Sequence, residues 1–154
     1  MKIIFLDIDG VLNSAAYDRV RGKDEGNIDE TRLPLLKSIV DTAQAHIVLA
    51  SSWRKHWERL PDLCDPIGRE LNVTFAKYGL SIYDRTPERA DGDRAAEIRE
   101  WLAANDAVTD FVILDDLRFG WGELQDRLVN TNHRIGRGLE ERHATDALRI
   151  LNKA

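Results

Sequence analysis

The 154-residue chain contains one cysteine, Cys64, one methionine and four prolines. A lone cysteine excludes an internal disulfide and a cysteine-rich zinc site and agrees with a reducing compartment, so we expect Cys64 to be a small buried apolar residue. No apolar run approaches the roughly 20 residues that a membrane-spanning helix needs. Because the first residues already have the pattern of a strand, we expect no signal peptide, no membrane partner and a cytoplasmic location.

The chain also lacks an excess of basic residues. Its 22 lysines and arginines stand against 27 acidic residues, which gives a net charge of −5. This balance argues against a protein that coats nucleic acid through a broad basic field, although it leaves a local basic rim open. A length of 154 residues suits one domain with a core around a sheet, so we expect a single domain over residues 1–154.

Short apolar runs alternate with segments of helical spacing. Four runs have the length of strands: residues 2–6, 46–50, 111–114 and 128–129. Three segments have apolar residues at helical spacing: residues 33–40, a segment that starts near Asp93, and residues 139–151. This alternation predicts an α/β protein, a Rossmann-like three-layer sandwich with a central, mainly parallel sheet.

Two segments lack a clear pattern. Residues 13–27 are polar and contain two glycines, so we expect a loop there. Residues 53–92 are expected to hold a short helix, a strand near residues 73–75 and irregular loop. Neither segment has room for a large folded insertion, so we expect a minimal cap or none. A nearly uncapped site would admit a bulky substrate, whereas small metabolites usually need enclosure.

Short polar residues follow three of the strand-like runs: Asp7 and Asp9, Ser51 and Ser52, and Asp115 and Asp116. Ligands bind outside the carboxyl ends of strands in an open parallel sheet, so these groups are expected to converge on one crevice. With the two-residue period of a strand, the two acids of the first group point the same way. Carboxylate oxygens at such a place suit Mg²⁺ and a phosphoryl group. An Asx-type turn would use the same residues for backbone capping.

In order and spacing these residues resemble the motifs of haloacid dehalogenase (HAD) superfamily phosphohydrolases: Asp-x-Asp, then Ser or Thr, then Lys or Arg, then an acidic pair. The corresponding residues of this chain are Asp7 and Asp9, Ser51, Arg94, and Asp115 with Asp116. More narrowly, the amino-acid sequence of four segments resembles the small HAD domain of Swiss Army Knife RNA repair proteins: residues 7–13, 51–54, 98–102 and 112–116.

The resemblance implies a phosphomonoester hydrolase that works through an aspartyl-phosphate. Asp7 would attack phosphorus, and Asp9 would protonate the leaving oxygen and then deprotonate water. Ser51 would donate a hydrogen bond to a phosphate oxygen, and Arg94 would offset the charge of the transferred group. Four other basic residues compete for that last role: Lys77, Arg85, Arg89 and Arg99.

The resemblance also implies a magnesium site. Asp7, the backbone carbonyl of Asp9, and Asp115 would hold the ion, with Asp116 bound directly or through water. Four acids in one crevice would repel one another strongly without a divalent cation, so a metal ion is a physical requirement of this arrangement.

Ser52, Trp53 and Arg54 are the expected substrate-binding residues. Trp53 suits stacking on a terminal base or packing against the sheet, and Arg54 suits either a substrate phosphate or a surface acid. The expected partner is a phosphorylated substrate, with a nucleic-acid end as the preferred class. A protein phosphatase, a small-molecule phosphatase and a catalytically silent phosphate-binding module remain alternatives.

Three further tryptophans and one histidine have expected positions of their own. We expect Trp57 and Trp101 to pack in the core, while Trp121 has either a packing or a rim position. His133 follows the last short strand and is expected to be a loop contact at most, because no cysteine or histidine cluster has metal-ligand spacing.

Overall fold

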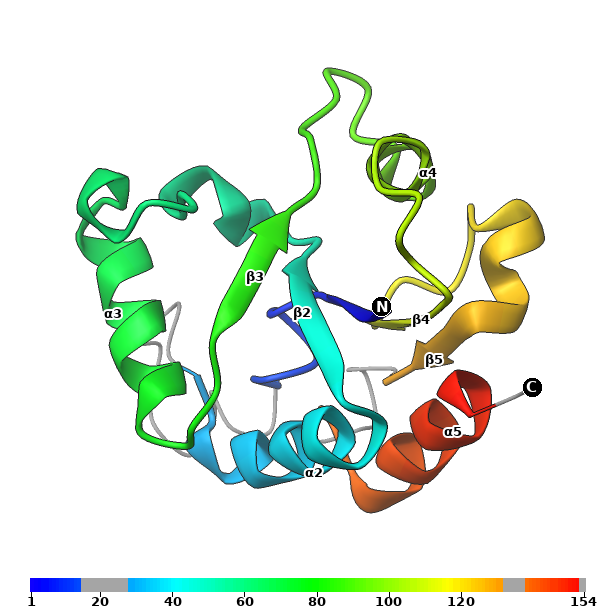
Figure 1. Ribbon diagram of the computed structural model, residues 1–154, viewed down its shortest axis with the longest axis horizontal. Coiled ribbons are helices and arrows are strands. Elements are labelled where there is room, and N and C mark those ends of the chain that lie inside the picture. Colours follow the sequence, from blue (N-terminus) through cyan, green and yellow to red (C-terminus); the bar gives the residue numbers. More distant parts are fainter. Residues whose placement is uncertain (15–27, 132–137, 153–154) are drawn as a thin grey trace.

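The computed structural model describes residues 1–14, 28–131 and 138–152. Their centre is a five-stranded sheet in the order β3-β2-β1-β4-β5, in which every pairing is parallel (Figure 1). The strands are β1 (Lys2–Leu6), β2 (Ala45–Leu49), β3 (Ile82–Arg85), β4 (Asp110–Asp115) and β5 (Leu128–Asn130). The expected α/β Rossmann-like fold with a parallel sheet is confirmed.

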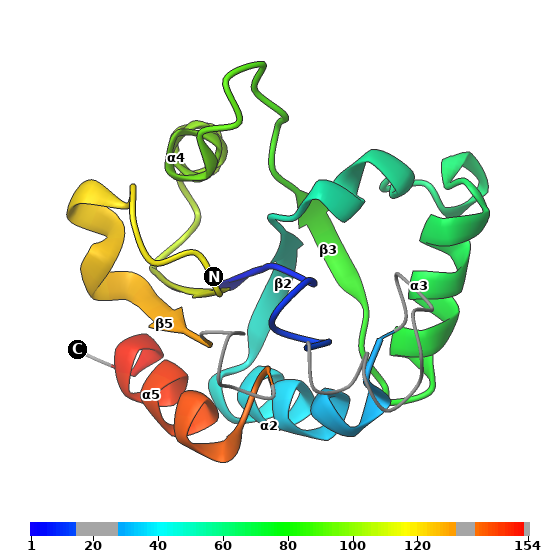
Figure 2. The ribbon, with the colours of Figure 1, turned by 180° about the vertical axis from the view of Figure 1, so that it is seen from behind.

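Helices cover both faces of the sheet, which makes three layers. Helices α2 (Leu33–Ala43) and α5 (Glu141–Leu151) lie side by side on one face, and α4 (Arg94–Ala103) lies on the other (Figures 1 and 2). The alternation of β1 explains this division: Ile4 and Leu6 belong to the core with α2 and α5, whereas Ile3 and Phe5 pack with α4.

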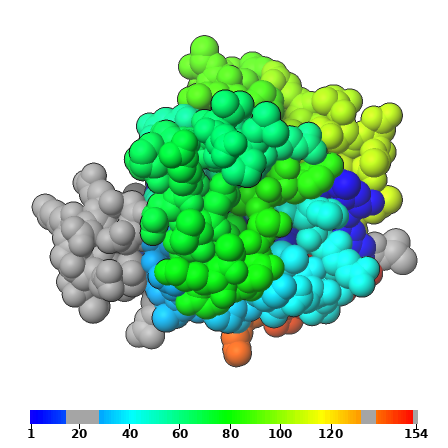
Figure 3. Space-filling view, turned by 60° about the vertical axis from the view of Figure 1, so that its left-hand side comes forward, coloured from blue at the N-terminus to red at the C-terminus, as the bar shows by residue number. Residues whose placement is uncertain are grey.

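The remaining described α-helix, α3 (Pro66–Ala76), lies at the β3 end of the sheet. Its Leu71 and Phe75 are buried in the same core cluster as α2 and α5. Together α3 and β3 form the green side of the molecule, between α4 and α2 (Figure 3). Short 3₁₀ helices complete the described chain: η1 (Glu30–Arg32), η2 (Ser52–His56), η3 (Pro61–Leu63) and η4 (Gly122–Arg127).

Side-chain caps set where several helices begin. Asp65 accepts hydrogen bonds from the backbone N–H groups of Ile67 and Gly68 at the start of α3, and Asp93 accepts one from Ala96 at the start of α4. Each carboxylate satisfies amide groups that the first helical turn leaves without a partner. The cap at Asp93 therefore fixes Arg94 as the first residue of α4.

Four of the expected strands and three of the expected helices are confirmed. The strand bounds agree within one residue, and the closing helix begins at Glu141 instead of residue 139. Cys64 is buried, as expected. None of the described helices is both long enough and apolar enough to cross a bilayer. The loop expected at residues 13–27 falls mostly outside the described residues, and His133 lies outside them as well.

The strand expected near residues 73–75 is wrong, because these residues lie in α3. The local β-propensity of valine and threonine is overridden by the Asp65 cap, by a proline in the first turn, and by burial of Leu71 and Phe75 four residues apart on one helix face. The strand of this region is β3, an edge strand in which only Ile82 is buried, so it lacks the apolar run of the central strands.

The start of α5 makes the stability of the fold pH-dependent. The backbone N–H of Glu140 donates to Nδ1 of His143, and burial, assisted by Arg142, lowers the pKa of that imidazole. The unfolded chain therefore binds a proton more readily than the folded one. The neutral His143 imidazole therefore contributes to the free energy of unfolding. This contribution is fully present above the pKa of histidine in the unfolded chain, about 6.5, and is lost as the pH falls below that value.

We expect His143→Gln to remove this dependence, because glutamine at the same position accepts the hydrogen bond without titrating. Between pH 7.5 and 5.5 the wild type should lose unfolding free energy relative to the variant, because only the wild type has the His143 imidazole, whose pKa is lowered by folding. Urea unfolding at the two pH values measures the difference. Parallel pH profiles for the two proteins would contradict the assignment.

Candidate active site

Three strand ends meet at one edge of the sheet. Leu6 of β1 pairs in register with Leu49 of β2 and Leu114 of β4. The next residue, Asp7, donates its backbone N–H to the Leu114 carbonyl at 3.0 Å and so lies level with Asp115. This register brings the residues that follow β1, β2 and β4 to one edge of the sheet. Three of the four acids expected in one crevice meet there, and Asp9 does not join them.

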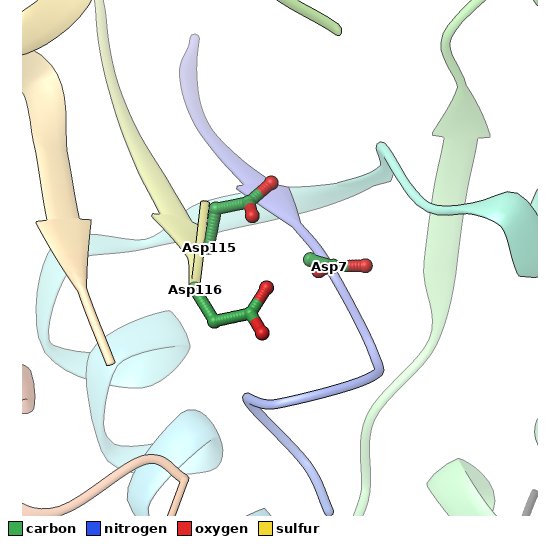
Figure 4. Close-up of side chains that lie close together, drawn as sticks. All are labelled: Asp7, Asp115 and Asp116. Atoms are coloured by element: carbon green, nitrogen blue, oxygen red, sulfur yellow. The ribbon is translucent and has the colours of Figure 1, made fainter. Parts of the chain in front are cut away.

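The side chains of Asp7, Asp115 and Asp116 form one carboxylate cluster. Each offers an oxygen atom, and these atoms all lie within 4.8 Å of one another (Figure 4). Asp7 is 5% exposed and Asp115 is 1% exposed, whereas Asp116 is half-buried. The chain thus places two desolvated carboxylates and a third, wetter one around the same small volume.

Burial makes the ionised form of this cluster costly. Desolvation raises the pKa of Asp7 well above its usual value, and repulsion from Asp115 and Asp116 adds to the rise. Desolvation likewise raises the pKa of Asp115, while Arg94 opposes the rise in both carboxyls. A bound cation would lower the cost of ionising these carboxyls further.

Arg94 reaches this cluster and contacts two of its members. Its Nη1 lies 3.1 Å from an Asp7 carboxylate oxygen and 2.8 Å from one of Asp115. The four basic residues that competed for this position have acidic partners elsewhere: Lys77 with Glu30, Arg85 with Glu58, Arg89 with Asp91 and Glu100, and Arg99 with Glu123.

The carboxylate of Asp9 lies outside the cluster and is exposed. One of its oxygens accepts from Nδ2 of Asn13 at 3.0 Å and the other from the indole Nε1 of Trp53 at 3.3 Å. Ser51 is fully buried, and its Oγ accepts from the backbone N–H of Trp53 at 3.2 Å. A hydrogen bond from Ser51 also lowers the pKa of Asp7.

Gly10 is required for the position of Asp116. Its φ of +82° is a left-handed conformation, and a Cβ built there would lie 2.3 Å from an Asp116 carboxylate oxygen. The Gly10 carbonyl accepts a buried hydrogen bond from Thr131 Oγ1 at 2.6 Å, and the Thr131 N–H donates to the Asp115 carbonyl. Sequence reasoning missed Thr131, although it follows β5 as the other polar residues follow their strands.

The expected substrate-binding residues differ in exposure. Ser52 is exposed and Trp53 is half-buried, but Arg54 is only 5% exposed. Its Nη2 lies 2.6 Å from an oxygen of buried Glu97, and its Nη1 donates to the Ser51 carbonyl. The expectation that Arg54 meets a phosphate or a surface acid is corrected, because its guanidinium is used inside the protein to support Ser51.

The remaining tryptophans lie in the core. Trp57 and Trp101 are buried, as expected, and Trp121 is 1% exposed with its indole N–H donating to the Leu117 carbonyl. Trp121 therefore packs in the core. Phe119, two residues earlier, is 80% exposed.

The ion pair between Arg54 and Glu97 joins the segment after β2 to helix α4, which carries Arg94. Glu97 also accepts the backbone N–H of Arg89 at 2.8 Å. We expect Glu97→Gln to lower the free energy of unfolding by about 3 to 5 kcal/mol, because it leaves a buried guanidinium without its counter-charge. Urea denaturation measures the loss.

The matched control is Glu123→Gln. It removes the exposed partner of Arg99, which lies on α4 as Glu97 does. An exposed pair contributes about 0 to 1 kcal/mol, so this variant should unfold close to the wild type. Equal stability losses in the two variants would contradict the importance assigned to the buried pair.

The comparisons with known proteins bear on this geometry. A family model described as the HAD domain in Swiss Army Knife RNA repair proteins matches residues 3–144, which include all three clustered acids and Arg94. Neither a search of curated proteins nor one of solved structures found a match. This family suggests a phosphatase-type hydrolase with a phosphorylated substrate, and HAD proteins generally use Mg²⁺. The chain belongs to the family of HAD domains found in Swiss Army Knife RNA repair proteins.

Proposed function

We propose that this protein is a magnesium-dependent phosphomonoester hydrolase that forms an aspartyl-phosphate on Asp7 and prefers polynucleotide ends. The observation that supports it most is the buried carboxylate cluster of Asp7, Asp115 and Asp116, with Arg94 in contact with two of its members. A structural role alone does not account for three carboxylates gathered where each raises the cost of ionising the next.

The donor set fits Mg²⁺. This ion takes oxygen ligands at about 2.0 to 2.1 Å, so two of its ligands lie no more than about 4.2 Å apart. Cluster oxygens within 4.8 Å of one another need only a small closure to reach that spacing. Asp7, Asp115 and Asp116 would hold the ion, together with the backbone carbonyl of Asp9. When bound, the ion supplies positive charge that offsets the phosphoryl oxygens.

The chain's own residues supply the two displacements. A carboxylate oxygen of Asp7 attacks phosphorus, and the bond from phosphorus to the leaving oxygen breaks while Asp9 gives that oxygen a proton. Asp9 then takes a proton from water, which attacks the aspartyl-phosphate and releases inorganic phosphate and Asp7. Ser51 and Arg94 bind the phosphoryl oxygens through both steps.

Three features support a polynucleotide end as the substrate class. The family is that of RNA repair proteins. In the described chain, the stretch between Ser51 and Arg94 builds η2, η3, α3 and β3 of the sandwich and forms no separate cap domain. Half-buried Trp53 at the site and exposed Phe119 after Asp116 offer aromatic faces on which bases stack.

The test is phosphate release with Mg²⁺ from oligonucleotides phosphorylated at either end, from phosphopeptides and from small monoesters. We expect turnover that a chelator abolishes and that oligonucleotides support best. Asp7→Asn should reduce it to background, and Asp9→Asn should reduce it by ~10² to 10⁴-fold. Phosphate release from small monoesters with none from oligonucleotides would overturn the substrate class, and no release from any substrate would overturn the activity.

Gly10→Ala tests the metal site separately from turnover. The added methyl group collides with the Asp116 carboxylate, so we expect Mg²⁺ affinity to fall by about tenfold or more, which is roughly 1.4 kcal/mol. Gly92→Ala is the control, because Gly92 also has a positive φ, of +68°, but its added methyl would meet nothing within 4 Å. Calorimetric titration measures both affinities, and equal values in the two variants would contradict the placement of Asp116 at the metal site.

A further inference from the structure

Trp53 contacts two of the proposed catalytic groups at once. Its indole Nε1 donates to a carboxylate oxygen of Asp9 at 3.3 Å, and its backbone N–H donates to Oγ of Ser51 at 3.2 Å. These two residues come from different strand ends, since Asp9 follows β1 and Ser51 follows β2. Through these two hydrogen bonds, Trp53 joins the two strand ends.

The surroundings of Trp53 fix the direction of its indole N–H. The ring is half-buried and packs against the larger core cluster, and the backbone lies in the 3₁₀ helix η2, which Ser51 caps. The next residue, Arg54, is locked by its ion pair with Glu97. The donor atom is therefore held by packing on the ring and by the anchored main chain on both sides.

The second oxygen of Asp9 is held in the same way. Nδ2 of Asn13 donates to it, and the Asn13 side-chain oxygen accepts the backbone N–H of Gly10 at 2.9 Å. Neither donor to Asp9 carries a formal charge or is a proposed metal ligand. Both fix the direction of the carboxylate without adding to the charge of the site.

We propose that Trp53 is a positioning residue, whose indole N–H orients the Asp9 carboxylate while its backbone N–H orients the Ser51 hydroxyl. This inference rests on the proposed function. It differs from a stacking role for the Trp53 ring, because the indole N–H would orient Asp9 in every turnover, whatever the substrate. It identifies Trp53 as the link that keeps the proton-transferring group aligned with the phosphoryl-binding hydroxyl.

Substrates that differ in leaving-group basicity distinguish a role of Trp53 in orienting Asp9 from a purely structural role. An alkoxide must receive a proton as it leaves, whereas p-nitrophenolate leaves readily without one. Misalignment of Asp9 therefore slows the release of an alcohol more than the release of a nitrophenol. The ratio kcat/KM reports the steps up to the first irreversible one, so it isolates the step in which the leaving group departs.

The experiment compares Trp53→Phe with the wild type on p-nitrophenyl phosphate, phenyl phosphate and methyl phosphate, in the presence of Mg²⁺. We expect kcat/KM for methyl phosphate to fall by about tenfold, as for the loss of one hydrogen bond. The kcat/KM for p-nitrophenyl phosphate should change much less. Across the three esters, kcat/KM should therefore fall more steeply with leaving-group basicity in the variant than in the wild type.

Trp57→Phe is the matched control. Its indole N–H also donates to a side-chain oxygen, that of Asn72 at 3.0 Å, in the same segment of the chain. We expect this variant to treat the three esters in the same proportions as the wild type. Replacing Trp53 with benzothienylalanine, which keeps the two-ring shape and lacks the N–H, gives a second variant if phenylalanine disturbs folding, and thermal unfolding monitors both.

Each outcome decides the proposal. A selective loss for methyl phosphate in the Trp53 variants supports it. An equal loss for all three esters, or no loss, would overturn it while leaving the hydrolase activity of the wild type intact. Absence of turnover by the wild type itself would instead overturn the proposed function and this inference together.

Discussion

The structure depends on the meeting of buried carboxylates at the carboxyl edge of a parallel sheet. The register between β1 and β4 sets Asp7 level with Asp115, and burial makes both of them costly to ionise. Arg94 offsets part of this cost, and a bound dication would offset the rest. In its ionised form such a cluster would be stabilised by a bound cation, as the proposed function requires.

The surrounding residues hold that edge in place by contacts across the chain. The ion pair between Arg54 and Glu97 connects the end of β2 to helix α4, and Thr131 connects the end of β5 to Gly10. Gly10 in turn leaves space for the Asp116 carboxylate. Residues outside the carboxylate cluster therefore hold the strand ends that carry its members.

The sequence allowed the central strands and three members of the acidic cluster to be predicted, because both depend on local patterns: apolar runs, and polar residues directly after them. The side chain of Asp9, the fourth acid expected there, lies outside the cluster. The sequence did not allow α3 to be placed, since a cap and tertiary packing decided that helix against local propensity. It did not allow β3 to be placed either, because this edge strand lacks an apolar run. The buried partner of Arg54 was also missed, because Glu97 lies 43 residues further along the chain. A charged residue on a predicted helix gives no sign, in one sequence, that its side chain faces inward.

The most direct test of the central claim is calorimetric titration of Mg²⁺ into the wild type and into Asp115→Asn. If the three carboxylates share a dication, the wild type should bind one ion per chain, and the variant should bind it far more weakly while remaining folded. Equal affinity in the two proteins, or no binding by the wild type, would contradict the account.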